Sequence, residues 1–251
     1  MIARARLGAA LAAGALVACT DISDNATTAL SLQFESLASP SVVVGDSLRD
    51  TTGVIAPPTV RAFNYQGEEI PAPPVRFFSI DRGLTVDSIS GVVTADSLRS
   101  TPGRIVASLG SLQALQSIDV TLRPDNVAAL AGVDTLRYSR IDSTVNVSRQ
   151  LTVEVTHGTT PNDSAVKSYV VSFAVVSGGS PAFAELVNDA GRASVVDTTD
   201  ASGVAGRALR VRPANLAVNE DSVIVNATVK YRGAPVSGSP VRLVLHVKPR
   251  T

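Results

Sequence analysis

Apolar and polar residues alternate with a period of two along most of the chain after residue 29, and this pattern restricts the fold more than any other feature. The clearest runs are residues 118–122, 151–156, 222–231 and 241–248. Successive side chains of a strand point to opposite faces, so the alternation predicts half-buried strands. The nearest approach to a helical stripe, residues 130–141, contains Gly132 and lacks capping residues. We therefore predict an all-β fold.

Turn-forming residues separate the predicted strands. Glycines next to polar residues recur at Gly45, Gly67, Gly83, Gly191 and Gly233, and the pair Pro102-Gly103 also predicts a turn. Short Val-rich strands spaced about 8 to 12 residues apart are typical of β-sandwiches and barrels. Helical periods between the strands would be needed for a parallel βαβ sheet, and the sequence has none.

The order of several short motifs is repeated in the two halves of the chain. Each half has a Val-x-Phe strand, then Ser-Gly-Val, then a closing strand that ends in Pro, and the pairs are residues 75–77 and 171–173, 90–92 and 202–204, and 118–124 and 243–249. We therefore predict two related domains, residues 29–124 and 125–251. Their lengths suit immunoglobulin-like sandwiches of about 100 residues.

The composition limits what can hold these domains together. The chain has one Cys, no Trp and only 4% aromatic residues among its 251. A single Cys excludes an intramolecular disulfide and a Cys-rich zinc site. We therefore expect aliphatic cores, closed by Phe77, Phe173 and Tyr231.

The N-terminus has the layout of a secretory signal peptide. Arg4 and Arg6 precede a stretch of small and apolar residues, residues 7–18. A spanning helix needs about 20 apolar residues, so this stretch is too short to cross a bilayer. Its last residues, Leu16, Val17 and Ala18 followed by Cys19, resemble the lipobox of bacterial lipoproteins. The alternative is an ordinary signal peptide with an incidental Cys.

The lipobox resemblance implies cleavage before Cys19 and attachment of lipid to its thiol. Residues 1–18 would then be the lipoprotein signal peptide, and residues 19–28 the lipidated Cys and a polar tether. Several acyl chains give lasting membrane attachment. Thr20 stands where some bacteria use Asp to retain lipoproteins at the inner membrane. We therefore expect a protein of the bacterial cell envelope, at the outer membrane or cell surface rather than the inner membrane.

Both halves of the chain resemble bacterial immunoglobulin-like domains of surface proteins. The first half carries this resemblance in residues 41–46, 60–67, 86–94 and 103–108. The second half resembles the invasin and intimin type, and its motifs are residues 171–179, 197–205 and 221–228. The resemblance implies two tandem β-sandwich domains in a protein that mediates adhesion.

The sequence contains no recognisable catalytic or metal motif. The only two His, His157 and His246, have no nearby nucleophile motif, and no G-x-S-x-G elbow occurs. Asp197 and Asp200 are weak candidates for calcium, because they lack the EF-hand spacing. The alternative is an Asx-type turn. We expect neither an enzyme nor a cofactor, and the zero net charge argues against nucleic-acid binding.

The sequence thus favours a non-catalytic lipoprotein, anchored to the membrane at Cys19, that presents two immunoglobulin-like domains. Its role would be adhesion, partner binding or spacing, with a protein or glycan as partner. The alternative is a carbohydrate-binding module for cell-wall or extracellular glycan. With no Trp, such a module would depend on exposed Tyr, and Tyr65, Tyr138 and Tyr231 are the candidates.

Overall fold

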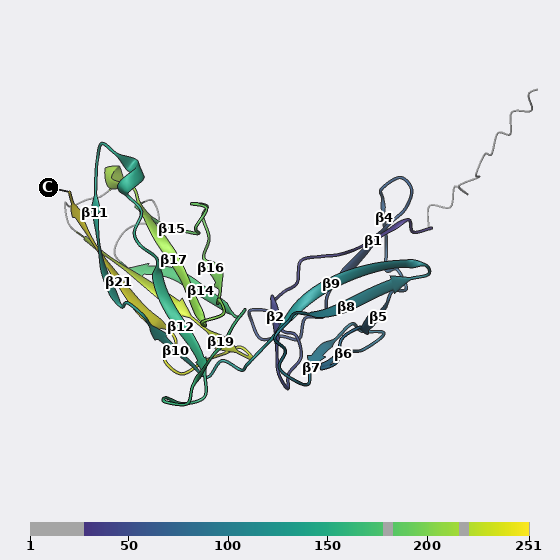
Figure 1. The fold of residues 1–251 in the computed structure, drawn as a ribbon. Helices are drawn as coiled ribbons and strands as arrows, with labels where there is room; N and C mark the ends of the chain where they lie inside the picture. Colours follow the sequence, from purple (N-terminus) through teal and green to yellow (C-terminus); the bar gives the residue numbers. More distant parts are fainter. Residues whose placement is uncertain (1–27, 178–182, 216–220, 251) are drawn as a thin grey trace, which may run out of the picture.

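The computed structural model describes residues 28–177, 183–215 and 221–250. The signal-peptide and lipobox predictions, Leu16 to Cys19 included, lie outside these residues. The described residues form β-strands, loops and two single turns of 3-10 helix, η1 (Ser143–Val145) and η2 (Pro213–Asn215). They build two β-sandwiches, one after the other along the chain (Figure 1). This confirms the predicted all-β fold class.

The second sandwich has two sheets that face each other. One has the strand order β10-β12-β17-β15, with β13 beside β12, and the other has the order β11-β21-β18-β14-β16. The bounds of the first sheet are β10 (Asn126–Ala129), β12 (Leu151–His157), β13 (Ser164–Ala165), β15 (Ala184–Val187) and β17 (Val204–Val211). Those of the second are β11 (Val133–Tyr138), β14 (Val170–Ser177), β16 (Val196–Thr198), β18 (Asp221–Thr228) and β21 (Val241–Pro249).

This strand order is that of an immunoglobulin domain. Strands β10, β12, β15 and β17 correspond to strands A, B, D and E of an immunoglobulin domain. The first sheet therefore has the order A-B-E-D. The second sheet places the last strand, β21, beside β18 and β14, as G-F-C. The early strand β11 pairs in parallel with β21, from Val133 opposite Val244 to Tyr138 opposite Pro249. The second sandwich is therefore immunoglobulin-like by its own topology.

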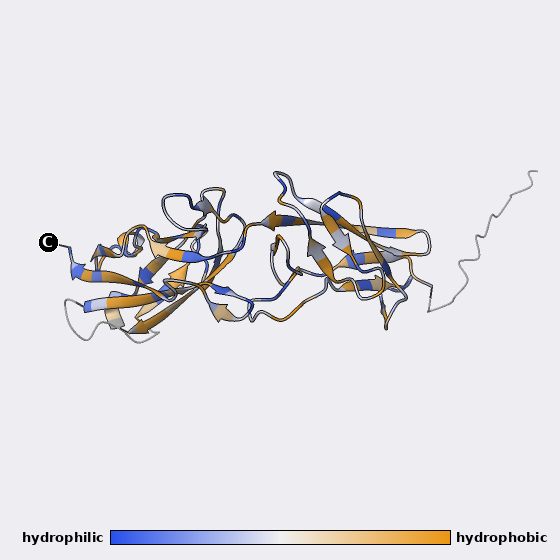
Figure 2. Cartoon of the chain, turned by 90° about the horizontal axis from the view of Figure 1, so that it is seen from below, coloured by the Kyte–Doolittle hydropathy of each residue, from blue (hydrophilic) through white to orange (hydrophobic). Residues whose placement is uncertain are grey.

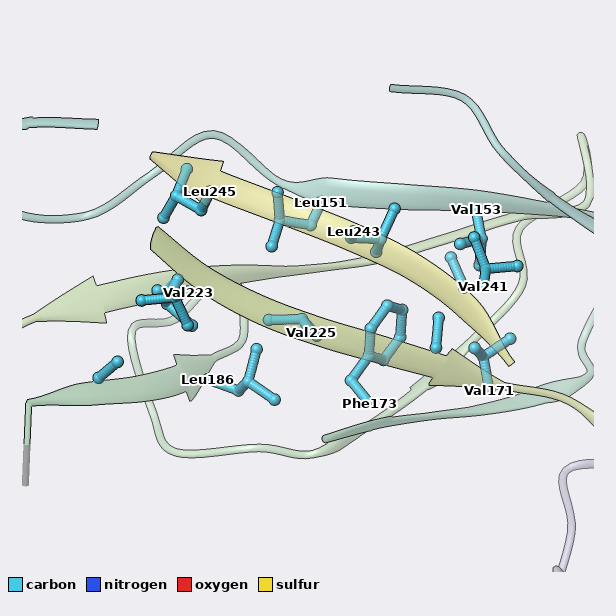
Figure 3. Close-up of a cluster of buried hydrophobic side chains, with 14 of the residues drawn as sticks. Leu151, Val153, Val171, Phe173, Leu186, Val223, Val225, Val241, Leu243 and Leu245 are labelled. Atoms are coloured by element: carbon cyan, nitrogen blue, oxygen red, sulfur yellow. The ribbon is translucent and has the colours of Figure 1, made fainter. Parts of the chain in front are cut away.

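Alternation of the sequence explains which side chains form the core of the second sandwich. Every second residue of β18 and β21 is buried, and the two strands pair so that Val223 lies opposite Leu245 and Val225 opposite Leu243. Side chains of both sheets meet between the layers (Figure 3). Phe173 closes this core as predicted, whereas the buried Tyr138 and Phe183 were not anticipated.

The first sandwich is smaller. Its strand orders are β2-β9-β8-β5 and β1-β3-β4, with a separate hairpin of β6 and β7. The bounds are β1 (Ser31–Phe34), β2 (Ser41–Val43), β3 (Val60–Phe63), β4 (Glu69–Ile70), β5 (Arg76–Ser79), β6 (Leu84–Val86), β7 (Val93–Ala95), β8 (Gly103–Leu109) and β9 (Leu112–Thr121). Here too an early strand, β2, pairs in parallel with the last strand, β9.

The repeated Ser-Gly-Val motif forms a similar glycine turn in both sandwiches, although the turn that starts at Asp87 is one residue longer than the turn that starts at Asp200. Gly91 and Gly203 both have positive φ, at 71° and 78°. In each turn the carboxylate of an Asp, Asp87 or Asp200, accepts hydrogen bonds from backbone N–H groups of the turn. The alternation is visible in Figure 2, where orange and blue segments follow one another along the strands of both sandwiches.

Three predictions from the sequence were wrong. Phe77 does not close the core of the first sandwich, because it is only half-buried and lies outside the buried cluster. Gly103 does not form a turn; it is the buried first residue of β8, and a Cβ there would lie 1.9 Å from Cδ1 of Leu84. Glycine is needed at this position for close packing. Tyr231 closes no core; it lies half-buried in the short β19 (Lys230–Tyr231), which pairs with β20 (Ala234–Pro235) where the sandwiches meet.

Candidate functional site: the junction between the sandwiches

The two sandwiches touch through a turn of the first, residues 50–54, and the β19–β20 turn of the second. Gly53 and Gly233 pack backbone to backbone, since a Cβ on Gly53 would lie 2.1 Å from the backbone nitrogen of Gly233. Both have positive φ, at 92° and 82°. Only glycine combines this backbone conformation with so close an approach.

Asp46 is the centre of the polar contacts at this junction. Its side chain is only 3% exposed. It accepts hydrogen bonds from the backbone nitrogen of Ser47 at 2.8 Å and from Nε and Nη2 of Arg49 at 3.0 Å each. From the other sandwich, Nε of Arg232 donates to Oδ2 of Asp46 at 2.8 Å. One buried carboxylate therefore joins an arginine of each sandwich.

The surroundings of Asp46 stabilise its charged form. Burial alone would raise the pKa of the carboxyl group, but the hydrogen bonds from Arg232, Arg49, Ser47 and Tyr231 outweigh burial and hold the pKa far below its usual range. The carboxylate stays charged at every pH at which the protein is expected to work. The Asp46–Arg232 contact is thus a permanent ion pair.

A second set of contacts joins the base of β14 to the first sandwich. Oγ of Ser41 donates to the carbonyl oxygen of Ser168 at 2.6 Å, and Oγ of Ser168 donates to Oδ2 of Asp119 at 2.6 Å. Close by, Nζ of Lys167 donates to the carbonyl oxygen of Arg99 at 3.3 Å. These contacts involve residues other than Asp46, so the junction is held at more than one point.

The segment that connects the sandwiches is itself fixed in place. Asp125 accepts hydrogen bonds from the backbone nitrogen of Gly158 at 2.9 Å and from Nε of Arg123 at 2.7 Å. Nδ1 of His157 lies 2.7 Å from Oδ2 of Asp125 and 2.9 Å from the carbonyl oxygen of Arg123. Burial would raise the pKa of Asp125, but these contacts hold it below its usual value. Residues 123–125 therefore do not form a loose linker.

A cleft of about 370 Å³ lies between the sandwiches beside Asp46. The first sandwich contributes Asp46 and Arg49 to its walls, and the second contributes Tyr169, Lys230, Tyr231 and Arg232. The hydroxyl group of Tyr169 donates to the carbonyl oxygen of Lys230 at 2.6 Å, and burial raises the pKa of this phenol. The guanidinium of Arg232 lies over the Tyr231 ring, 5.3 Å from its centre.

The two candidate calcium ligands are engaged by the protein itself. Asp200 makes Asx-type contacts, because its Oδ1 accepts from the backbone nitrogens of Ser202 at 2.8 Å and Val204 at 3.0 Å. Asp197 accepts from the backbone nitrogen of Gly206 at 2.7 Å and forms an ion pair with Arg207 at 2.8 Å. Within the described ranges, no group of three or more His, Cys, Asp or Glu is placed to hold a metal ion.

Both histidines are partly exposed. His246 pairs across strands with Ser222, whose Oγ lies 2.8 Å from Nδ1 of His246. In the part of the chain that the structure describes, no carboxylate is hydrogen-bonded to His246, so this pair lacks the third member of a catalytic triad. Of the candidate aromatic residues, Tyr138 is buried and cannot stack on a sugar, whereas Tyr65 is exposed on a turn and Tyr231 lines the cleft.

The junction could not be found by sequence reasoning. Asp46 and Arg232 are 186 residues apart, and each stands next to a glycine in a motif that predicts only a turn. The only shared feature is that Asp46 lies shortly after the end of β2 and Arg232 directly after the end of β19. Recognising this feature requires the topology to be known first.

The described residues contain no helix long and apolar enough to cross a membrane. No protein-family model matches the sequence, and no curated protein matches it. Among solved structures, the chain is similar to domains 4 and 5 of the S-layer protein SbsC, with 12% identity over 87% of this chain and 96% of that chain and a TM-score of 0.32. It is also similar to human protocadherin-24 EC1-2, with 12% identity, 89% and 100% coverage and a TM-score of 0.30. A chimeric titin Z1Z2 matches with 14% identity, 89% and 99% coverage and a TM-score of 0.26.

Proposed function

We propose that this protein is a non-catalytic lipoprotein of the bacterial cell envelope that is anchored at Cys19 and presents two bacterial immunoglobulin-like domains, the second of the invasin type. The domains span residues 29–124 and 125–251, and the role is adhesion, partner binding or spacing. The motif Leu16-Val17-Ala18-Cys19 supports the anchor.

The observation that carries the presenting role is the fixed junction. Asp46 with Arg232, Ser41 with Ser168, and Gly53 with Gly233 join the sandwiches end to end. Strand β1 and the end of β21 then lie at opposite ends of the molecule (Figures 1 and 2). A protein tethered before β1 would hold the far end of the second sandwich away from the membrane.

The anchor is tested by fractionating bacteria that express the full chain or its Cys19→Ser variant. We expect the wild-type chain in the membrane fraction, with incorporation of labelled palmitate, and the variant in the soluble fraction without label. A Thr20→Ser variant, which keeps the thiol, is the matched control and should behave as the wild type. Equal membrane association and labelling of Cys19→Ser would overturn the proposed attachment.

The exposed side of the membrane is tested by protease treatment of intact cells. Display at the cell surface predicts that the wild-type sandwiches are degraded without opening the envelope. Protection until the envelope is opened would contradict surface display and would place the sandwiches in the periplasm.

A further inference from the structure

The cleft between the sandwiches has more cationic than anionic side chains. Arg49, Lys230 and Arg232 line it, against the carboxylates of Asp46 and Asp50. At neutral pH this leaves an excess of one positive charge. Binding pockets for small molecules are found preferentially between domains and have volumes from about 300 Å³ upward, so the cleft is of sufficient size for a small ligand.

The two carboxylates of the cleft already have partners, whereas two of its cations keep donors to spare. Asp46 is surrounded by donors, and Oδ1 of Asp50 accepts from Oγ1 and the backbone nitrogen of Thr52. Within the described residues, the ammonium group of Lys230 has no hydrogen-bond acceptor, and the guanidinium of Arg232, which is bonded to Asp46 and Tyr231, keeps further N–H groups. The cleft therefore has N–H groups that could donate hydrogen bonds to a bound ligand.

The remaining walls carry hydroxyl groups and two aromatic rings. Five hydroxyl side chains of the cleft, none of them with a partner among the described residues, can both donate and accept: Ser39, Ser47, Thr51, Ser172 and Thr228. Tyr169 and Tyr231 add rings. Hydroxyl groups suit a ligand with several hydroxyls, and the rings suit a ligand with an apolar ring face.

From these features we infer that the cleft binds a small acidic sugar, in which a ring with several hydroxyls carries a carboxylate. The carboxylate would contact Lys230 and the terminal nitrogens of Arg232. The sugar hydroxyls would contact the Ser and Thr side chains of both sandwiches. A plain inorganic anion would fill little of the 370 Å³ cleft and would leave its aromatic rings without a partner, and a neutral sugar would bring no negative charge to the cations. This inference goes beyond the proposed function and does not depend on lipid attachment.

The test is an amide NMR shift titration of the purified full chain. The probes are glucuronic acid and galacturonic acid, with glucose, galactose and acetate as the matched compounds that lack either the charge or the ring. We expect at least one uronic acid to shift amides of residues 46–53 and 228–233. Glucose, galactose and acetate should bind at least about tenfold more weakly, since a hydrogen bond between charged groups is worth that factor or more.

Two charge-removing variants locate the site. Lys230→Gln should weaken uronic acid binding about tenfold, while its unfolding midpoint stays that of the wild type because Lys230 is exposed. Lys248→Gln removes the same charge from the other end of the same sandwich and should leave binding unchanged. The inference is overturned if neither uronic acid binds, if the shifts lie outside the cleft, or if Lys230→Gln has no effect. Equal binding of acetate or of the neutral sugars would also overturn it.

Discussion

The two sandwiches share several features but differ in strand order and greatly in how many apolar side chains each one buries. In the second, long strands of both sheets contribute to one extensive cluster, from Val127 to Val247. In the first, strands of three or four residues are common, and the cluster around Ile105 and Val120 is small. Both nevertheless pair an early strand in parallel with the last one and repeat the Ser-Gly-Val turn. The parallel strand pair and the turn therefore recur in two sandwiches whose buried clusters differ in size, and we expect the larger cluster to make the second sandwich the more stable.

The difference in core size is tested by truncating one buried leucine or isoleucine in each sandwich. This change should have the largest effect on the free energy of unfolding. Leu243→Ala and Ile105→Ala both truncate side chains that are fully buried, and each should lower the free energy of unfolding of its sandwich by about 3 kcal/mol. The first sandwich, with less burial to lose, should unfold at ambient temperature, whereas the second should stay folded. Calorimetry of the full chain resolves the two transitions. Equal tolerance in both sandwiches would contradict the comparison.

Asp46→Asn should have the next largest effect, and it should fall on the first sandwich. The change removes a buried negative charge between two guanidinium groups, and it should cost about 2 kcal/mol because both arginines are partly solvated. Loss of the ion pair should also let the sandwiches move relative to each other, which small-angle scattering would detect. Glu69→Gln, at an exposed ion pair of the same sandwich, is the control and should change neither quantity.

The pH dependence of the junction follows from the lowered pKa of Asp46. A carboxyl group whose pKa is lower in the folded state contributes its full stability above the unfolded value of about 3.9. That contribution is lost as the pH falls below this value toward the folded pKa. Scattering curves of the wild type should therefore be the same at pH 7 and pH 5. A change of shape between these two values would show that another group controls the junction.

Two glycine substitutions distinguish strain within the first sandwich from loss of the contact between the sandwiches. Gly45→Ala and Gly53→Ala both place a side chain at positive φ in the first sandwich, which should cost about 1 kcal/mol each. Nothing lies within 4 Å of the new Cβ at Gly45, whereas at Gly53 it would clash with Gly233 of the second sandwich. Only Gly53→Ala should separate the sandwiches. Similar scattering curves for the two variants would show that the backbone contact is dispensable.

The smallest effect is expected at the repeated turn. Asp87→Ala and Asp200→Ala remove the same kind of carboxylate-to-backbone hydrogen bonds from the two sandwiches. Each should lower the unfolding temperature less than Gly53→Ala does, and the shift should be greater in the first sandwich. A greater shift for Asp200→Ala would contradict the view that the first sandwich depends more on its turns.

Much of the fold could be predicted from the sequence because it depends on local patterns. The alternation in residues 241–248 gives the buried face of β21, and the Ser-Gly-Val motif gives the turns that precede β7 and β17. The junction depends instead on contacts between distant residues. Neither Asp46 with Arg232 nor Gly53 with Gly233 leaves a local pattern, because each residue alone suits an ordinary turn. Gly103 was misjudged for the same reason, since the side chain that excludes a Cβ there belongs to Leu84.

The parallel pairing of early and last strands also determines how the molecule would bear a mechanical load. If residue 30 and residue 249 are pulled apart, β2 is drawn one way and β9 the other, and the same holds for β11 and β21. The hydrogen bonds of each pair lie across the direction of pull, so they must break together rather than one at a time. Single-molecule pulling should therefore record one sharp force peak for each sandwich. The longer pairing of β11 with β21 should give the higher peak, so that the first sandwich yields before the second.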